Sequence, residues 1–275
     1  MRLKLPRVYE SYPLEYAQFI LGRPIFQPFL ELLEKLSMLA LNVSGGAHVD
    51  TSGEMWVLEF LKKRWKDRHA IIFDVGANTG EYALAANDVF GDAATIYAFE
   101  PSAPTFEMLR EALRSKPNII ARRIGLGVLD EDAALFMDVA GSPFATRYPE
   151  YLSSHNLPLP LVETVPFRSL DSLAVEESIE HIDLLKLDVE GHEYAALDGA
   201  RRMLSEGRIE AIQWEFGPGA IDSRTYFRDF YRLLNSNYRI YRILKSGLRE
   251  IKRYTELQER FYVSNFLAVR REPVD

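Results

Sequence analysis

The sequence predicts an α/β protein with a mostly parallel seven-stranded sheet, an antiparallel edge strand and an N-terminal helical arm. From residue 70 onward, short apolar β-like segments alternate with helical segments of about ten residues, which is typical of a parallel sheet covered on both faces. The last two β-like segments have no long helix between them, so we expect them to pair antiparallel at one edge. With 275 residues, of which 47% are hydrophobic, the chain can bury a full core.

The expected strands cover residues 71–75, 95–99, 118–124, 182–188, 209–216, 238–244 and 261–269. Helical patterns fill most of the gaps, at residues 81–90, 103–115, 193–205 and 225–235. The alternation breaks at residues 133–168, where two strand-like stretches flank the loop "GSPFATRYPEYLSSHNLPLP". We expect this stretch to be an insertion above the functional site.

The segment before residue 54 differs from the rest, so we predict an N-terminal helical arm over residues 1–53 and the main domain over residues 54–275. The stretch "FLELLEKLSMLALNV" has apolar residues at helical spacing and is followed by the loop "SGGAHVDTSGE". The amphipathic arm is expected to pack on the core or on a sister subunit, which makes a homodimer possible. Substrate gating and contact with a membrane surface are the alternatives. A further helix, "EMWVLEFLKKRW", opens the main domain.

Composition excludes several classes of protein. A net charge of −7 and a pI near 5.4 argue against a nucleic-acid partner, although these averages do not describe local patches. The absence of cysteine excludes disulfides, a thiolate nucleophile and zinc-thiolate sites. The first residues contain proline and charge in place of an apolar core, so they predict neither a signal peptide nor a transmembrane segment. We therefore predict a cytoplasmic protein.

The stretch "IIFDVGANTGEYA" (residues 71–83) runs from the first strand through a glycine-containing turn into a helix. Such a turn anchors a ligand at the carboxyl end of a parallel sheet. It contains Gly76 and Gly80 but not the three glycines of a dinucleotide site. Asp74 suits a ligand with an amine and a positive charge, such as S-adenosylmethionine; alternatively, it only caps nearby backbone. Ala77 and Asn78 complete the expected turn.

A second acid supports this interpretation. Glu100 stands twenty residues beyond Gly80, in "TIYAFEPS", at the end of the second strand, where a carboxylate can accept hydrogen bonds from both ribose hydroxyls. Alternatively, it is an acid at a helix start, followed by Pro101. The residues expected to bind the cofactor are Asp74, Gly76, Ala77, Asn78, Gly80, Glu100 and Pro101.

The stretch "KLDVEGHE" carries the expected catalytic groups. Lys186, Asp188 and Glu190 alternate at the end of the fourth strand, so they would face one side if the strand continues. Lys186 is either a paired inner-face lysine or a substrate contact. Gly191 permits a tight turn, and Glu193 is expected to be structural, at the start of a helix.

His192 is a candidate general base for an attacking hydroxyl, or a solvated residue at a helix start. Tyr194 and Trp214 are either core aromatics, the interpretation we prefer, or part of an acceptor pocket. Asp188 and Glu215 end neighbouring strands and could share one Mg²⁺. We favour direct contacts of these carboxylates over a metal, because no third ligand is evident.

These segments resemble the FkbM family of S-adenosylmethionine-dependent methyltransferases. The likeness covers residues 54–270 and is carried by "FDVGANTGEYA", "YAFEPS", "LDSL", "IDLLKLDVEGHEYAALDGA", "IQWEF" and "SNFLAVR". It implies a Rossmann-like class I methyltransferase fold and methylation of a hydroxyl on a sugar, glycan, glycolipid or related natural product. The N-terminal arm and residues 141–160 match no family pattern, so we expect them to select the acceptor. The alternatives are a non-catalytic methyltransferase-like interaction module and a nicotinamide-dependent oxidoreductase.

Overall fold

The computed structural model describes residues 18–43, 48–66, 68–158 and 160–272, and the chain divides into two compact units, residues 1–43 and 44–275. The first unit contains a 3-10 turn, η2 (Pro24–Phe26), and helix α2 (Gln27–Ala40). Prolines stand in the first turn of both, where the missing N–H is not needed. The sequence placed the boundary at residue 53, whereas α3 (Val49–Ser52) lies in the second unit.

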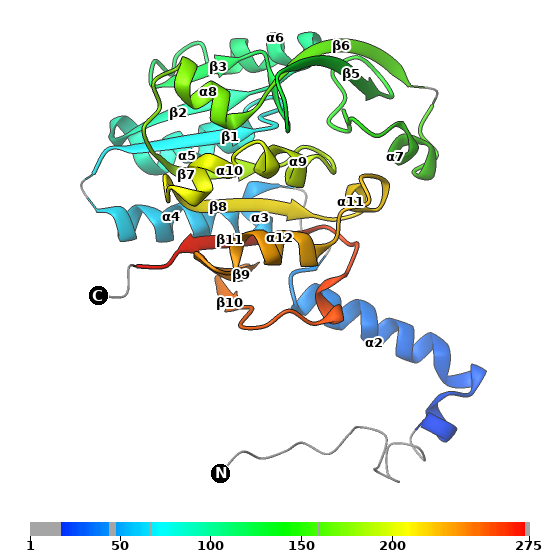
Figure 1. Cartoon of the computed structure of the whole chain (residues 1–275). Helices are drawn as coiled ribbons and strands as arrows, with labels where there is room; N and C mark the ends of the chain where they lie inside the picture. Colours follow the sequence, from blue (N-terminus) through cyan, green and yellow to red (C-terminus); the bar gives the residue numbers. More distant parts are fainter. Residues whose placement is uncertain (1–17, 44–47, 67, 159, 273–275) are drawn as a thin grey trace. The chain divides into compact units, whose positions relative to one another are not determined.

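An eight-stranded sheet forms the centre of the second unit, in the order β10-β9-β11-β8-β7-β1-β2-β3 (Figure 1). The first five strands along the chain are parallel, whereas β11 is antiparallel to both β8 and β9. The predicted antiparallel pairing of the last two expected strands is therefore confirmed. An eighth strand, β10, pairs antiparallel with β9 and forms the edge. The strands are β1 (Ala70–Val75), β2 (Ala94–Phe99), β3 (Ile119–Arg122), β7 (Ile182–Leu187), β8 (Ile209–Phe216), β9 (Tyr238–Leu244), β10 (Gly247–Glu250) and β11 (Ser264–Arg270).

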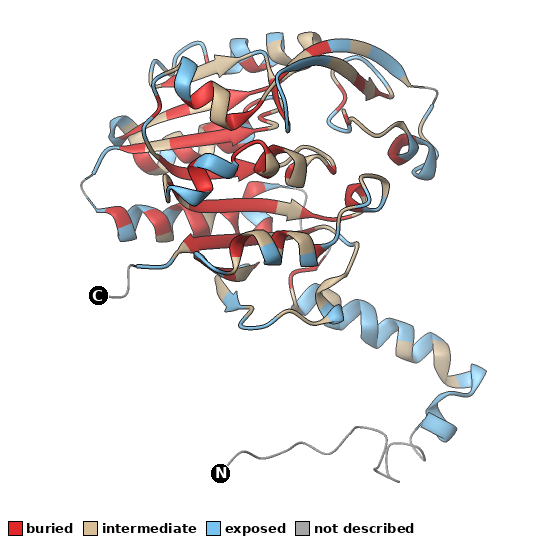
Figure 2. Cartoon of the chain, viewed as in Figure 1, coloured by how far each residue is buried: buried red, intermediate tan, exposed pale blue. Residues whose placement is uncertain are grey.

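Helices cover both faces of this sheet, as the alternating pattern predicts (Figure 1). One face packs against α4 (Glu54–Trp65), α5 (Glu81–Phe90) and α6 (Ala103–Ala112). The other packs against α8 (Leu170–Glu176), α9 (Glu193–Asp198), α10 (Arg201–Ser205) and α12 (Phe227–Leu234). The strands between the layers are mostly buried, as Figure 2 shows, and the two layers supply two apolar clusters.

One expected helix, residues 193–205, is divided into α9 and α10 around Gly199. A Cβ at Gly199 would lie 2.0 Å from the carbonyl oxygen of Gly127, so the chain turns where two backbones meet. Asp171 then caps α10 by accepting hydrogen bonds from the N–H groups of Arg202 and Met203. The helical periodicity continues through this break, which is why the sequence does not reveal it.

The aromatic core confirms the preferred interpretation of Trp214 and Tyr194. Trp214 is fully buried and stacks on Phe230 with 5.5 Å between ring centroids, while Tyr194 contacts the same ring edge to face. Burying a side chain of this size stabilises the fold by roughly 1.5–3 kcal/mol. Trp214 on β8 and Tyr194 on α9 therefore both pack against α12.

The predicted insertion is confirmed as a small second sheet with the order β4-β6-β5. Its elements are β4 (Gly125–Leu126), β5 (Glu131–Met137), α7 (Pro149–Ser154) and β6 (Leu161–Arg168). The remaining short elements are η3 (Gly91–Ala93), α11 (Gly219–Asp222) and η4 (Glu256–Gln258). No helix in the described part of the chain has the length and apolar character to cross a bilayer.

Candidate functional site

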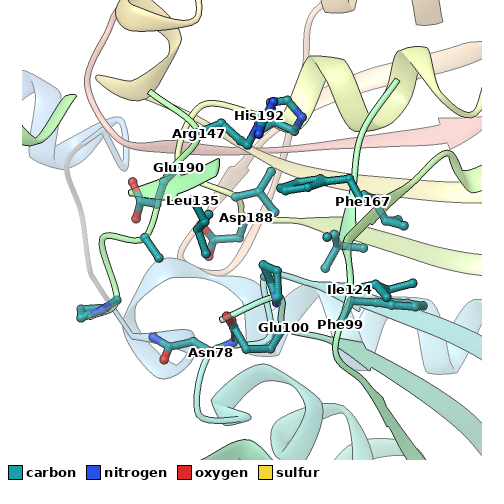
Figure 3. Close-up of a pocket in the computed structure, with 18 of the residues that line it drawn as sticks. Asn78, Phe99, Glu100, Ile124, Leu135, Arg147, Phe167, Asp188, Glu190 and His192 are labelled. Atoms are coloured by element: carbon teal, nitrogen blue, oxygen red, sulfur yellow. Dashed lines mark hydrogen bonds between the residues drawn. The ribbon is translucent and has the colours of Figure 1, made fainter. Parts of the chain in front are cut away.

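A pocket lies at the carboxyl ends of β1, β2 and β7 and is bounded by the inserted sheet (Figure 3). It lies where β1 is flanked by β2 on one side and β7 on the other, the topological switch point at which parallel sheets bind ligands. Seven predicted site residues line this pocket: Gly76, Asn78, Glu100, Pro101, Asp188, Glu190 and His192. The pocket lining does not include Asp74, Ala77, Gly80 or Lys186.

The turn after β1 is held against both neighbouring strands. The N–H groups of Gly76 and Ala77 donate to the carbonyl oxygen of Phe99 on β2, at 3.0 and 2.9 Å. Gly76 has a φ of +80°, and a Cβ there would lie 1.8 Å from the carbonyl oxygen of Asp188. This glycine is required by the close approach of the two loops. Gly80 precedes the first residue of α5 and packs against Leu109 of α6, away from the pocket.

Glu100 lies at the end of β2 with its carboxylate in the pocket (Figure 3). One oxygen accepts from the N–H of Asn78 at 3.1 Å, and the other accepts from the N–H of Ser102 at 2.9 Å. These two bonds orient the carboxylate and leave further lone pairs for a ligand. Burial raises the pKa of Glu100 to about 7, although both backbone hydrogen bonds oppose that rise. The carboxylate is therefore charged above about pH 7.

Asp74, which the sequence places at the ligand, is fully buried beneath the pocket. Alternation along β1 turns its side chain towards α5, and the lysine on the adjacent strand meets it there. The Nζ of Lys186 lies 3.2 Å from Asp74 Oδ1 and 3.3 Å from Asp188 Oδ2. It also lies 5.1 Å from the ring centroid of Tyr82. Lys186 thus links the buried aspartate to the partly exposed one, as expected of a paired inner-face lysine.

Asp188 and Glu190 line the pocket from the turn after β7, and not, as the sequence predicted, through alternation along a continuing strand. The strand ends at Leu187, and Glu190 has a left-handed φ of +50°, so strand alternation does not orient these side chains. The carboxylate of Glu193 accepts from the N–H groups of Val189 and Gly191, at 2.9 and 3.2 Å. Glu193 therefore holds the turn, in agreement with the structural role preferred from the sequence.

His192 lines the pocket but is already engaged by the insertion. Its Nδ1 lies 2.9 Å from the hydroxyl of Tyr148, and its ring packs edge to face against Phe167. Burial, and then the charge of Arg147, lower the pKa of His192 to about 4. The imidazole is therefore neutral at neutral pH, but a pKa this far below neutral makes it a weak base.

Two further contacts connect the insertion to the same turn. The hydroxyl of Thr146 donates to the carbonyl oxygen of Glu190 at 2.8 Å. The hydroxyl of Tyr151 hydrogen-bonds the carboxylate of Glu190, whose pKa rises to about 8 because of burial and the nearby charges of Asp188 and Glu193. The turn after β7 is therefore the anchor of the insertion as well as a wall of the pocket.

The two carboxylates weighed as metal ligands lie at neighbouring strand ends, because the register pairs Leu187 of β7 with Trp214 of β8. Glu215 does not line the pocket. Burial and the charge of Asp188 raise its pKa well above the ordinary value. In the described residues, no three histidine or acidic side chains are grouped so that they could hold a metal ion.

Several apolar lining residues were not expected from the sequence. Phe99, Ile124, Leu126, Leu135 and Phe167 form an apolar wall, and nothing in the sequence distinguishes them from core residues. Arg147 projects from the insertion, donates to the carbonyl oxygen of Ala134 at 2.9 Å and lies 4.9 Å from the centroid of the Phe167 ring. The loop's mix of aromatic and polar residues gives the only sequence signal for this part of the site.

The residues present suit S-adenosylmethionine. The oriented Glu100 carboxylate matches a ribose diol, the apolar wall matches a purine face, and Asp188, whose side chain is 39% exposed, supplies negative charge for a sulfonium or amine. The fold and this site together define a Rossmann-like class I methyltransferase domain.

Residues 74–243 match the Methyltransferase FkbM domain, and the chain belongs to that family. It is 28% identical over 169 residues to the hexuronic acid methyltransferase AglP of Haloferax volcanii; the match covers 61% of this chain and 65% of that relative's length.

The chain is also similar to solved structures. A SAM-dependent methyltransferase from Agrobacterium tumefaciens has a TM-score of 0.42 at 10% identity, with 80% of this chain and 62% of that chain covered. A SAM-dependent O-methyltransferase from Thermotoga maritima has a TM-score of 0.40 at 12% identity, with 80% and 66% covered.

Proposed function

We propose that this chain transfers a methyl group from S-adenosylmethionine to an oxygen of a sugar, a glycan or a related natural product. The observation that carries the proposal is the buried carboxylate of Glu100, oriented by two backbone N–H groups at the pocket wall. When bound, the donor supplies a methyl group on a positively charged sulfur. The name of the Haloferax relative supports a sugar as the acceptor.

Different residues of this chain would bind different parts of the donor. Glu100 would accept hydrogen bonds from the ribose hydroxyls, and the apolar wall would hold the adenine. Asp188 would face the positive end of the donor, with its own position held by Lys186 at 3.3 Å. Asp74 would act through Lys186, because it is buried and does not line the pocket.

The acceptor side is formed by the turn after β7 and by the insertion. An attacking hydroxyl must lose its proton, and Asp188 and His192 line the pocket as acceptors for it. Glu190, with a pKa of about 8, is largely protonated at neutral pH. Because the Nδ1 of His192 contacts the Tyr148 hydroxyl, proton uptake at Nε2 requires the tautomer in which Nδ1–H donates to that hydroxyl. We propose that residues 141–160 select the acceptor, since Arg147 from this stretch lies in the wall.

Calorimetry tests the donor site. The protein is expected to bind S-adenosylmethionine and S-adenosylhomocysteine, and Glu100→Ala should weaken both by on the order of 2–5 kcal/mol through loss of charge-assisted hydrogen bonds. Glu111→Ala, on the exposed side of α6, is the matched control and should bind normally. Tight NADH binding without S-adenosylmethionine binding would favour the oxidoreductase instead. Absence of binding to either would favour an interaction module.

Transfer of a labelled methyl group to glycans tests the acceptor class. A neutral sugar and the matching uronic acid should be offered side by side, because an ether product resists mild alkali whereas a methyl ester is hydrolysed. Label that survives alkali identifies a hydroxyl acceptor. Label that is released identifies a carboxylate, and label confined to protein or amine acceptors contradicts the proposal.

A further inference from the structure

Three arginines form a cluster that the methyl-transfer site does not use. Arg242 on β9 and Arg249 on β10 are directly opposite each other in the antiparallel register, so their side chains lie on the same face. Arg260, in the loop before β11, acts on Arg242 with like charge. Like charges directly across a strand pair destabilise it, so this arrangement has an energetic cost.

In the described part of the chain, no acid forms an ion pair with Arg242, Arg249 or Arg260. The Nε of Arg242 is buried and has no hydrogen-bond partner there, and the charges that lower its pKa, after burial, are those of Arg260 and Arg249. The acid nearest in sequence to Arg260, Glu259, already accepts from the N–H groups of Phe227 and Arg228 and from the hydroxyl of Tyr254. Glu250 follows Arg249 on β10 and therefore points to the other face.

The cluster lies at the same edge of the sheet as the pocket. Strands β8 and β9 are both antiparallel to β11, so β9 ends at the carboxyl edge where the pocket is found. Strand β9 is three strand spacings from β7, which is roughly 14 Å. Residues 242–260 contain six basic and three acidic residues, in a chain whose net charge is −7.

We propose that Arg242, Arg249 and Arg260 bind a phosphate group, carried as a monoester or a diester. The guanidinium fork matches phosphate oxygens in pairs, and a phosphate placed among three such groups would remove their mutual repulsion. A phosphate monoester brings three acceptor oxygens and nearly two negative charges, against two oxygens and one charge for a carboxylate. An acceptor that carries a phosphate would bind the three arginines with its phosphate while its hydroxyl lies in the methyl-transfer pocket. This last link rests on the proposed function, whereas the phosphate site does not.

Phosphate binding is measured with the whole chain, without donor or acceptor, so failure of methyl transfer would not affect the result. Thermal unfolding is followed in phosphate and in chloride at equal ionic strength for the wild type, Arg249→Gln and Arg260→Gln. Arg239→Gln is the matched control, because Arg239 is exposed on β9 and alternates to the opposite face from Arg242.

Phosphate should stabilise the wild type and Arg239→Gln, and phosphate affinity should fall roughly tenfold or more in the other two variants. In chloride, Arg249→Gln and Arg260→Gln should unfold at or above the wild-type temperature, which shows that they fold. Equal phosphate effects in all four proteins, or none beyond ionic strength, would overturn the proposal.

Two probes identify the source of the phosphate. If the wild type sediments with phosphatidylglycerol vesicles but not with phosphatidylcholine vesicles, the phosphate belongs to a lipid headgroup. Arg249→Gln should then no longer sediment. Competition by glucose 1-phosphate without sedimentation assigns it to a soluble sugar phosphate.

Discussion

Replacing Lys186 with methionine tests whether this lysine is a structural partner of the buried aspartate. Asp74 has no exposed surface, and its ion-pair partner is the Nζ of Lys186 at 3.2 Å. Burial alone would lower the pKa of Lys186, but the carboxylates of Asp74 and Asp188 outweigh it and raise that pKa above the ordinary value. The lysine is therefore charged in the folded protein at every working pH.

Removing one partner of a buried ion pair typically costs about 3–5 kcal/mol, because the other charge remains without compensation. A chain of this size is stabilised by roughly 5–15 kcal/mol, so Lys186→Met should lower the urea midpoint substantially. The double variant Lys186→Met with Asp74→Asn removes both charges and should recover at least half of the loss. Lys116→Met provides the control, since its pair with Asp88 is exposed and should be worth less than about 1 kcal/mol.

Equilibrium unfolding in urea, followed by tryptophan fluorescence and circular dichroism, measures these differences. A loss below about 1 kcal/mol for Lys186→Met would refute the reasoning. So would a double variant no more stable than the single one, because the cost would then not arise from the uncompensated aspartate.

Three further predictions concern the pocket. Affinity for S-adenosylmethionine, measured by calorimetry, should fall as the pH is lowered through about 7, where Glu100 takes up its proton, and should be nearly independent of pH in Glu100→Gln; an unchanged pH profile in that variant argues against the assignment. Tyr148→Phe should lower the free energy of unfolding by about 1–2 kcal/mol, since His192 loses its partner, while donor affinity changes less than twofold; a tenfold loss of affinity would place Tyr148 in the donor site. Methyl transfer should persist in EDTA, because Asp188 and Glu215 have no third ligand beside them in the described residues, and loss of activity that magnesium restores would show the opposite.

Periodicity was sufficient to predict most of the fold. The predicted helices at residues 54–65 and 81–90 coincide with α4 and α5, because local signals define them. Gly53 precedes α4, and Gly80 and Gly91 flank α5. The division of α9 from α10 depends on a backbone contact with Gly127, which lies far away in sequence. Such a contact leaves no periodic signal.

The site was predictable only where a motif determines it. Glu100 and Asn78 lie in the pocket as expected, because strand ends of a parallel sheet meet at one edge. Asp74 points the other way because alternation along β1 directs it to Lys186. The apolar wall was not predictable, since the sequence pattern around Phe99 and Phe167 is the same as around core residues. They come to line the pocket only through the tertiary fold.

The path of the chain through the small sheet makes the insertion an exchangeable unit. The chain enters it at β4 and leaves it at β6, and these two strands are parallel neighbours, with Gly125 opposite Phe167. Segments with adjacent ends can be replaced without moving the framework that holds them. A chimera that takes this region from another family member should therefore acquire a new acceptor. It should keep the cofactor site only if the graft has apolar residues where Leu126, Leu135 and Phe167 line the pocket. The graft must retain hydroxyl groups where Thr146 and Tyr151 meet the turn at Glu190.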